Sequence, residues 1–241
     1  MFKPWLNCLV LASSLFVLTP VVSAQPLPLP DNLVAINSNQ GVELFQQSQD
    51  KSAFWQLMPY FVTQKNLTYC AVASSAMVLN ALKVPAPISP TYQPYDLVTQ
   101  NNFFTPAVMK YVTPSQVNMR GVTLDALAKA LSTFDVKVSK EYGNHISEDK
   151  FRNVAKANVS SKHSFMLVNF CRKYLGEKGC GHFSPLAAYN KSKDSFLIMD
   201  VSRYKYPPTW VKTGDLYKSI STGLDSDSGK HRGFLVISAK S

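Results

Sequence analysis

The sequence has little of what marks the more specialised protein classes. Only four of its 241 residues are cysteine, too few for a scaffold built on many disulfides. It has no internal repeat of roughly 20–50 residues. Beyond its N-terminal segment, no apolar run approaches the roughly 20 residues that cross a bilayer. These absences exclude a disulfide-dense scaffold, a repeat array and a membrane span in the body of the chain.

Acidic residues are also scarce relative to basic ones. There are 25 Lys and Arg against 15 Asp and Glu, so the formal net charge is +10. The basic residues are scattered, with neither a Lys/Arg cluster nor a DNA- or RNA-binding motif, so we expect no nucleic-acid partner. The charge is compatible both with a small anionic substrate and with a soluble cationic protein of no special preference.

What is present is the composition of an ordinary folded protein. Apolar residues make up 46% of the chain and aromatic residues 12%, enough apolar surface to offset the entropy lost when the backbone is ordered. Helical patterns come first and strand patterns later, which predicts an α+β domain. Helices are predicted to begin at Ser38, Ala53, Cys70, Thr123 and Ser147, and strands to cover residues 34–36, 136–138, 165–170, 182–189, 195–201 and 234–238.

The first 24 residues have the layout of a secretory signal peptide. Lys3 precedes an apolar stretch at residues 6–18, and Val22 and Ala24 are small enough for a cut after Ala24. The stretch is shorter than the roughly 20 residues of a membrane helix; an uncleaved anchor is the alternative. We therefore expect an exported, periplasmic protein with a signal peptide over 1–24, a linker and N-terminal segment over 25–36, and one folded domain over 37–241.

Export changes the cysteine count. Cys8 leaves with the signal, so the mature chain retains Cys70, Cys171 and Cys180. An exported protein meets an oxidising compartment, and three is an odd number of cysteines. If Cys171 and Cys180 pair across their short loop, Cys70 is left as a free thiol, which singles it out as a reactive residue.

Cys70 follows an irregular segment and begins a predicted helix rich in small side chains. There a thiol feels the positive end of the helix dipole, which favours the nucleophilic thiolate; a buried structural cysteine is the alternative. The strands at 182–189 and 195–201 form a hairpin whose register brings Asp200 opposite His182 or one step away. An Asp beside a His fixes the imidazole tautomer and supports its protonated form. A polar pair on a solvated face is the alternative.

Gln64 lies six residues before Cys70, on the segment that leads into the helix. Its side-chain amide can donate a hydrogen bond to a developing oxyanion, together with the backbone N–H of Cys70. The order Gln64, Cys70, His182, Asp200 is similar to that of the papain-like cysteine peptidases. The other histidines of the mature chain have no comparable partner and are expected at the surface. They are His145, His163 and His231.

Longer motifs make the resemblance more specific. It is carried by residues 69–75 (YCAVASS) with 78–82 (VLNAL), 181–186 (GHFSPL), 200–211 (DVSRYKYPPTWV) and 229–234 (GKHRGF), which resemble the phytochelatin synthases. The resemblance extends over residues 37–238 and implies a papain-like α+β fold, with an N-terminal helical part carrying the Cys and a C-terminal antiparallel sheet carrying the His and Asp. It implies that Cys70 is the nucleophile and His182 the general base. Asp200 would orient His182, and Gln64 would be the oxyanion donor.

The resemblance also implies a reaction. The family cleaves the Cys–Gly bond of glutathione, releases glycine and holds γ-Glu-Cys as a thioester. A second glutathione or a longer chain then accepts the acyl group, which makes phytochelatins that sequester heavy metals. No cofactor is implied for this chemistry, and heavy-metal ions such as cadmium are expected as activators or as metal–thiolate substrate. With water as the acceptor, the same acyl-enzyme hydrolyses glutathione to γ-Glu-Cys.

The sequence departs from the family pattern in two ways that bear on the reaction. Ala71 follows the nucleophile where the family usually has glycine, a change of one methyl group that we expect to be tolerated. The chain also ends just after the catalytic domain, without the Cys-rich second domain of the plant enzymes. We therefore expect hydrolysis to compete strongly with metal-stimulated chain extension.

The γ-glutamyl end of glutathione carries an α-carboxylate and an α-ammonium, so its site needs a cation and an anion together. Arg232 suits the carboxylate and Asp225 the ammonium, and Arg172 is a second candidate for the carboxylate. For each, an exposed charge without a specific role is the alternative. No metal-binding residues are predicted. The other predicted substrate-binding residues are Asn169, Gly181 and Phe183.

Two other functions stay open on the sequence. One is a general papain-like cysteine peptidase, which would ignore the γ-linkage. The other is a metal-binding protein that uses thiolates and His182, although the cysteine spacings match no zinc finger and no Cys-x-x-Cys occurs. The expected partners are glutathione and γ-Glu-Cys peptides. The oligomeric state is left open, with a homodimer among the options.

Overall fold

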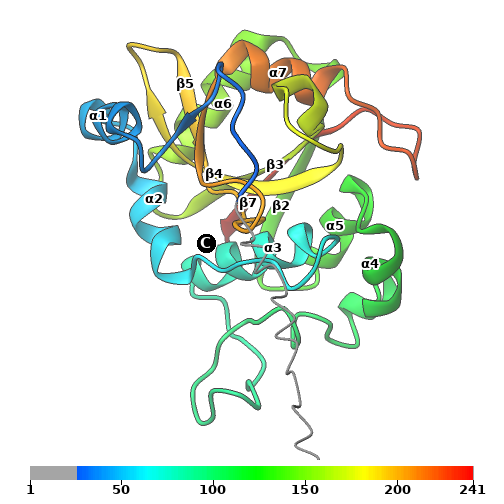
Figure 1. Ribbon diagram of the computed structural model, residues 1–241. Coiled ribbons are helices and arrows are strands. Elements are labelled where there is room, and N and C mark those ends of the chain that lie inside the picture. Colours follow the sequence, from blue (N-terminus) through cyan, green and yellow to red (C-terminus); the bar gives the residue numbers. More distant parts are fainter. Residues whose placement is uncertain (1–25, 241) are drawn as a thin grey trace, which may run out of the picture.

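The computed structural model describes residues 26–240 (Figure 1). The predicted signal peptide, including Cys8, lies outside the described residues, as does Gln25. The helices of the described part are α1 (Asn39–Gln47), α2 (Ser52–Leu57), α3 (Cys70–Ala81), α4 (Pro114–Arg120), α5 (Leu124–Leu131), α6 (Glu148–Val159) and α7 (Thr213–Ser221). Its strands are β1 (Val34–Ala35), β2 (Val136–Tyr142), β3 (Ser164–Phe170), β4 (His182–Asn190), β5 (Ser195–Ile198), β6 (Thr209–Lys212) and β7 (Gly233–Ala239).

All these strands belong to one sheet in the order β1-β6-β5-β4-β3-β7-β2. Every neighbouring pair is antiparallel. β4 lies at the centre, with Phe170 of β3 opposite His182 on one side and Phe196 of β5 opposite Tyr189 on the other. The predicted α+β class is therefore confirmed, with an antiparallel sheet in the C-terminal half.

Serine and threonine side chains begin four of the helices. Each accepts a hydrogen bond from the backbone N–H three residues further on, which satisfies a donor that has no partner inside the helix. These residues are Ser38 for α1, Thr113 for α4, Thr123 for α5 and Ser147 for α6. The helix starts predicted at 38, 123 and 147 are confirmed.

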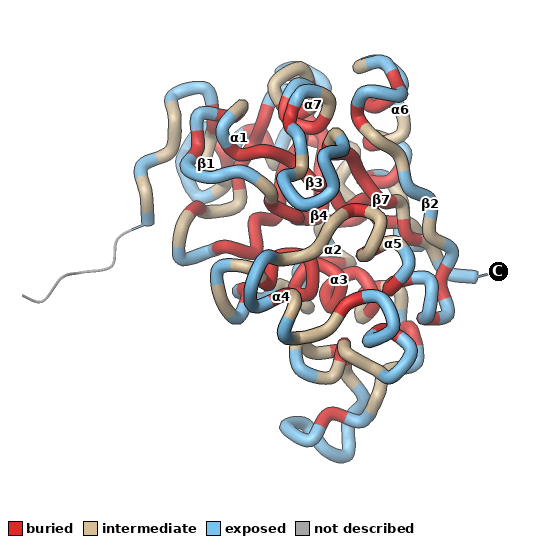
Figure 2. Tube along the Cα trace, turned by 90° about the vertical axis from the view of Figure 1, so that its right-hand side faces the viewer, coloured by how far each residue is buried: buried red, intermediate tan, exposed pale blue. Residues whose placement is uncertain are grey.

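The helix that begins with Cys70 is different, because it has no polar face. Every residue of α3 except Asn80 is buried, so the helix lies inside the core rather than on it. It packs against β4 and β3. In Figure 1, α3 lies below these strands and α6 and α7 lie above them. In Figure 2, buried residues gather along α3 and the central strands. Packing against these strands therefore fixes the position of Cys70 at the start of α3.

The structure departs from the predicted elements in a few places. β5 ends at Ile198, so Asp200 lies just after the strand instead of on it. The helices α4 and α7 and the short strand β6 were not predicted. The strand β6 has only four residues after two prolines, too few for its alternation to be recognised. The strand predicted at 34–36 is confirmed as β1, which pairs with β6, and the segment before it is also held to the fold, since the N–H of Leu27 donates to the carbonyl of Lys205 (2.9 Å).

Candidate active site

Cys70 is the first residue of α3 and is only 7% exposed. No side chain caps this helix start, so backbone N–H groups of the first turn remain available beside the thiol. The helix is tied to the sheet one turn later, where the hydroxyl of Ser74 donates to the carbonyl of Phe183 (3.1 Å). That bond holds Cys70 next to the start of β4.

His182 begins β4 and is 5% exposed. Its Nε2 lies 2.9 Å from Oδ1 of Asp200 and 3.0 Å from Oγ of Ser184. The imidazole also acts on the Cys70 thiol, whose pKa it lowers. Because Nε2 is occupied by Asp200 and Ser184, Nδ1 is the nitrogen that exchanges a proton with the thiol.

The charged forms of Cys70 and His182 stabilise one another. Burial alone would raise the pKa of Cys70, but the charge and hydrogen bond of His182, with a backbone hydrogen bond from Phe183, lower it overall. Burial and the charge of Arg172 oppose protonation of His182, yet Asp200 and the Cys70 thiolate raise its pKa. The arrangement therefore favours a thiolate beside an imidazolium, the reactive form of a nucleophilic cysteine.

Arg172, which is 3% exposed, binds the carboxylate oxygen of Asp200 that does not contact His182. Its Nη2 lies 2.6 Å from Oδ2 of Asp200, and its Nη1 pairs with the buried Glu177. Burial would raise the pKa of Asp200, but the charges of His182 and Arg172 hold it well below its usual range. Asp200 is therefore a carboxylate fixed from both sides, by the imidazole and by the guanidinium.

Arg172 was predicted as a second candidate for a substrate carboxylate, and its placement does not favour that role. Its guanidinium is already shared between Asp200 and Glu177 and does not line the pocket around Cys70. Sequence reasoning missed Glu177 and Ser184. Ser184 could have been found, because it lies two residues after His182 on the same strand and so shares its face. Glu177 lies in an irregular loop and gave no signal.

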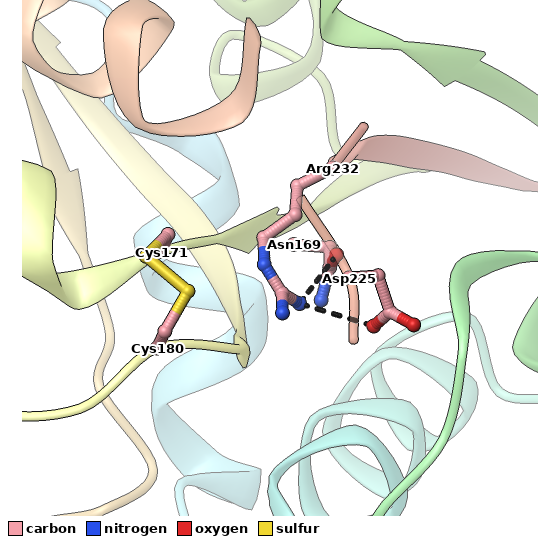
Figure 3. The surroundings of a disulfide bond; sticks show 5 residues. All are labelled: Asn169, Cys171, Cys180, Asp225 and Arg232. Carbon is pink, nitrogen blue, oxygen red and sulfur yellow. Dashed lines mark hydrogen bonds and ion pairs between the residues drawn. A yellow bond between two sulfur atoms is a disulfide. The ribbon is translucent and has the colours of Figure 1, made fainter. Parts of the chain in front are cut away.

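The pocket around Cys70 brings together the other predicted substrate-binding residues. Asn169, Gly181, Phe183, Asp225 and Arg232 all line it. Nη1 of Arg232 lies 3.2 Å from Oδ1 of Asn169 and 3.4 Å from Oδ2 of Asp225 (Figure 3). Arg232 is 5% exposed, and burial lowers its pKa although Asp225 and Cys70 act in the opposite direction.

Two donors in this pocket have no protein partner. Among residues 26–240, Nδ2 of Asn169 and Nε of Arg232 are buried without a hydrogen bond. Buried donors of this kind are costly unless a ligand satisfies them. Gly181 has a left-handed φ of +76°, and a Cβ at this position would lie 2.9 Å from Nη2 of Arg232. Glycine is therefore required for Arg232 to approach so closely.

Gln64 is buried near this site, but its amide is already engaged. Nε2 donates to the carbonyl of Asn66 (2.6 Å) and to the hydroxyl of Tyr204 (3.0 Å), while Oε1 is buried without a partner among the described residues. With both amide hydrogens in use, this arrangement leaves the backbone N–H groups at the start of α3 as the available oxyanion donors. The role predicted for Gln64 requires its amide to release one of these partners.

The cysteines pair as the odd count suggested. A disulfide joins Cys171 to Cys180, and Cys70 is the free cysteine of the described residues. Because a disulfide removes two thiolates, these two cysteines do not serve as metal ligands in this form. In residues 26–240 no group of three or more His, Cys, Asp and Glu side chains is arranged to hold a metal ion. Nor does any helix in that range have the length and apolar character of a membrane span.

The family model for phytochelatin synthase matches residues 24–234 of the chain. The chain belongs to the phytochelatin synthase family. It is 32% identical over 216 residues to glutathione gamma-glutamylcysteinyltransferase 1 of Lotus japonicus, covering 88% of this chain and 41% of that protein. Its identity to the enzyme of the same name from Arabidopsis thaliana is 31%, covering 88% and 43%. The Schizosaccharomyces pombe glutathione gamma-glutamylcysteinyltransferase is 28% identical over 87% of this chain and 50% of its own length.

The chain thus spans between about two fifths and one half of the length of these relatives. A solved fragment of prointerpain A from Prevotella intermedia is also similar, with 12% identity and a TM-score of 0.40, covering 85% of this chain and 75% of that one. The family resemblance read from the motifs is confirmed by the family model and the curated relatives.

Proposed function

We propose that this chain is a thiol acyl-enzyme that acts on glutathione. The observation that carries the proposal is one pocket with two halves. One half holds Cys70, whose pKa is lowered by a His182 that Asp200 fixes, and the other holds the buried Arg232 paired with the partly buried Asp225. The first half supports nucleophilic attack on a carbonyl, and the second suits the zwitterionic γ-glutamyl end of the substrate.

In the proposed reaction, the Cys70 thiolate attacks the carbonyl of the Cys–Gly bond. Backbone N–H groups at the start of α3 stabilise the oxyanion. The imidazolium of His182 gives its Nδ1 proton to the departing glycine amine, and γ-Glu-Cys remains as a thioester on Cys70. Asp200 keeps Nε2 protonated and the ring in place, and Arg172 keeps Asp200 charged.

Arg232 and Asp225 favour this substrate over an ordinary peptide. An α-carboxylate accepts hydrogen bonds from a guanidinium and from the unpartnered amide of Asn169. An α-ammonium pairs with Asp225. A general papain-like peptidase has no need for a cation paired with an anion at a fixed distance from its thiolate, so this pair supports a γ-glutamyl substrate.

The fate of the thioester is part of the proposal. Transfer to a second glutathione makes phytochelatins, and transfer to water makes γ-Glu-Cys. We propose that both occur, and that a heavy-metal ion enters as a metal–thiolate substrate or activator and not through a resident metal site. We further propose that residues 1–24 are a signal peptide, that residues 37–241 are the catalytic domain, and that the protein is exported to the periplasm. A homodimer is compatible with this proposal.

The test is incubation of the purified protein with glutathione, with and without cadmium, followed by separation of the thiol products. Release of glycine without metal is expected, with γ-Glu-Cys as product and longer γ-Glu-Cys peptides on addition of cadmium. Cadmium binding without glycine release would instead favour a metal-binding protein. Equal cleavage of ordinary peptides would favour a general peptidase.

A further inference from the structure

The Cys171–Cys180 disulfide lies at the base of the loop that leads into His182. Cys171 directly follows β3, and Cys180 lies two residues before His182 at the start of β4. Phe170 and His182 are opposite each other in this antiparallel pair, so the disulfide ties the two ends of the intervening loop just beyond the last paired residues. It therefore constrains the backbone immediately before the imidazole.

The same loop carries the groups that hold Asp200. Arg172 follows Cys171 and donates to Oδ2 of Asp200, and Glu177 binds the other side of the guanidinium. Near its far end, the loop is also held by Lys178, whose N–H donates to the hydroxyl of Tyr206 (2.8 Å). These contacts do not involve the disulfide, so its loss is expected to weaken them and loosen the loop without unfolding it.

The disulfide also faces the pocket. Cys171 is buried, but Cys180 is exposed and lines the same pocket as Cys70 and Arg232. Figure 3 shows the disulfide beside the side chain of Arg232. A small anionic thiol that enters this pocket is attracted by Arg232 and meets the sulfur of Cys180 at its edge.

We propose that the Cys171–Cys180 disulfide is a thiol-exchangeable clamp that sets how firmly Asp200 and His182 are held. A low-molecular-weight thiolate attacks Sγ of Cys180, which forms a mixed disulfide and expels Cys171 as a thiolate that takes a proton from water. A second thiolate attacks the small-molecule sulfur of that mixed disulfide and releases Cys180. Two small thiols are thereby oxidised to their disulfide, and the protein disulfide is reduced to two thiols.

Opening the clamp changes the catalytic pair. With the loop free at Cys180, Arg172 is held less firmly, and Asp200 orients His182 less well. The imidazolium then supports the Cys70 thiolate less, so Cys70 becomes a weaker nucleophile. This proposal rests on the proposed roles of Cys70, His182 and Asp200. It makes the reactivity of Cys70 depend on the ratio of thiol to disulfide around the protein.

The experiment uses 2-mercaptoethanol and its disulfide in mixtures of fixed ratio, so that the proposed substrate is not needed. Alkylation and peptide mass mapping give the fraction of protein with an open disulfide, and separately the rate of Cys70 alkylation at about pH 6. We expect the disulfide to open in excess thiol and Cys70 alkylation to slow by roughly threefold or more. The double variant Cys171→Ser/Cys180→Ser should show the slow rate at every ratio.

Two results would overturn the proposal. One is a disulfide that stays closed in a large excess of thiol. The other is a disulfide that opens while the rate of Cys70 alkylation stays the same. Circular dichroism of the reduced wild-type protein separates loosening of the loop from unfolding. Neither readout depends on glycine release, so a failure of the proposed glutathione chemistry would be seen separately.

Discussion

At the scale of single residues, the state of the proton shared by Cys70 and His182 governs reactivity. The pKa of Cys70 is lowered, mainly by His182 acting against burial, and the pKa of His182 is raised, mainly by Asp200 acting against burial and Arg172. As the pH rises, the thiolate–imidazolium pair forms when Cys70 loses its proton and disappears when His182 loses its own.

This pair predicts a bell-shaped dependence of kcat/KM on pH. The acid limb should lie below the ordinary pKa of a thiol, and the alkaline limb above the ordinary pKa of an imidazole. In Asp200→Asn, which removes the charge that supports the imidazolium, we expect the plateau to narrow and kcat to fall by about 10²–10⁴-fold. Glycine release measured across pH tests this. A wild-type acid limb at the ordinary thiol pKa would contradict it.

The nucleophile itself gives the second prediction. Cys70→Ser and Cys70→Ala should lose glycine release by several orders of magnitude, because a serine hydroxyl is not ionised near neutral pH and is a weaker nucleophile. Mass spectrometry of the wild-type protein with glutathione should find γ-Glu-Cys attached to Cys70. Attachment at Cys171 or Cys180 would move the reaction to another residue.

Under the proposed function, Arg232 binds the γ-glutamyl end of the substrate. Arg232→Ala should lower kcat/KM for glutathione by roughly tenfold to a thousandfold, because the α-carboxylate loses a buried, charged partner. The α-linked isomer Glu-Cys-Gly should be a poor substrate of the wild-type protein, and it serves as the matched control. Equal turnover of the two isomers would leave a general thiol peptidase.

At the scale of elements, the turn into β4 has to pass close to Arg232. Gly181→Ala places a methyl group against Nη2 of Arg232 in a left-handed backbone, so both stability and substrate binding should suffer. Gly229 has a similar φ of +67° but open space around its Cβ position. Gly229→Ala is therefore the matched control, with the same backbone cost of about 1–2 kcal/mol.

We expect both glycine variants to lower Tm, Gly181→Ala by more because its methyl group also displaces Arg232, and only Gly181→Ala to raise KM for glutathione several-fold. Thermal unfolding and initial-rate kinetics measure the two effects. Equal values of KM in the two variants would show that the space beside Arg232 is not needed.

Comparison of the predicted with the observed helices and strands shows what could be predicted from the sequence. The start of α3, the caps of α1, α5 and α6 and the central strands follow from local patterns, and the motifs around Cys70 and His182 gave the family. The surroundings of Arg172 and Gln64 did not follow. The partner of Gln64, Tyr204, is 140 residues away, and Asp200 is 28 residues from Arg172. No local periodicity reports such contacts. The fold and the His182–Asp200 contact were therefore predictable, and the partners of Arg172 and Gln64 were not.

At the scale of the whole molecule, the proposed export and the oxidation of Cys171 and Cys180 can be tested together. Protein from its native compartment should begin at Gln25 and carry one alkylatable thiol, Cys70, with the Cys171–Cys180 disulfide formed. N-terminal sequencing and mass analysis without reductant check both points. An intact N-terminus would indicate an uncleaved anchor. Three free thiols would mean that the disulfide does not form there.

The N-terminal segment has a practical consequence for anyone who purifies this protein. Leu27 is hydrogen-bonded to Lys205, and the side chain of Lys205 in turn binds the carbonyl of Lys178 in the loop before His182. An affinity tag fused directly ahead of residue 26 is therefore linked to that loop through only two hydrogen bonds. A tag after β7 adds its bulk at the end of a strand that pairs there with the start of β2, and is the better choice when kinetics are to be measured.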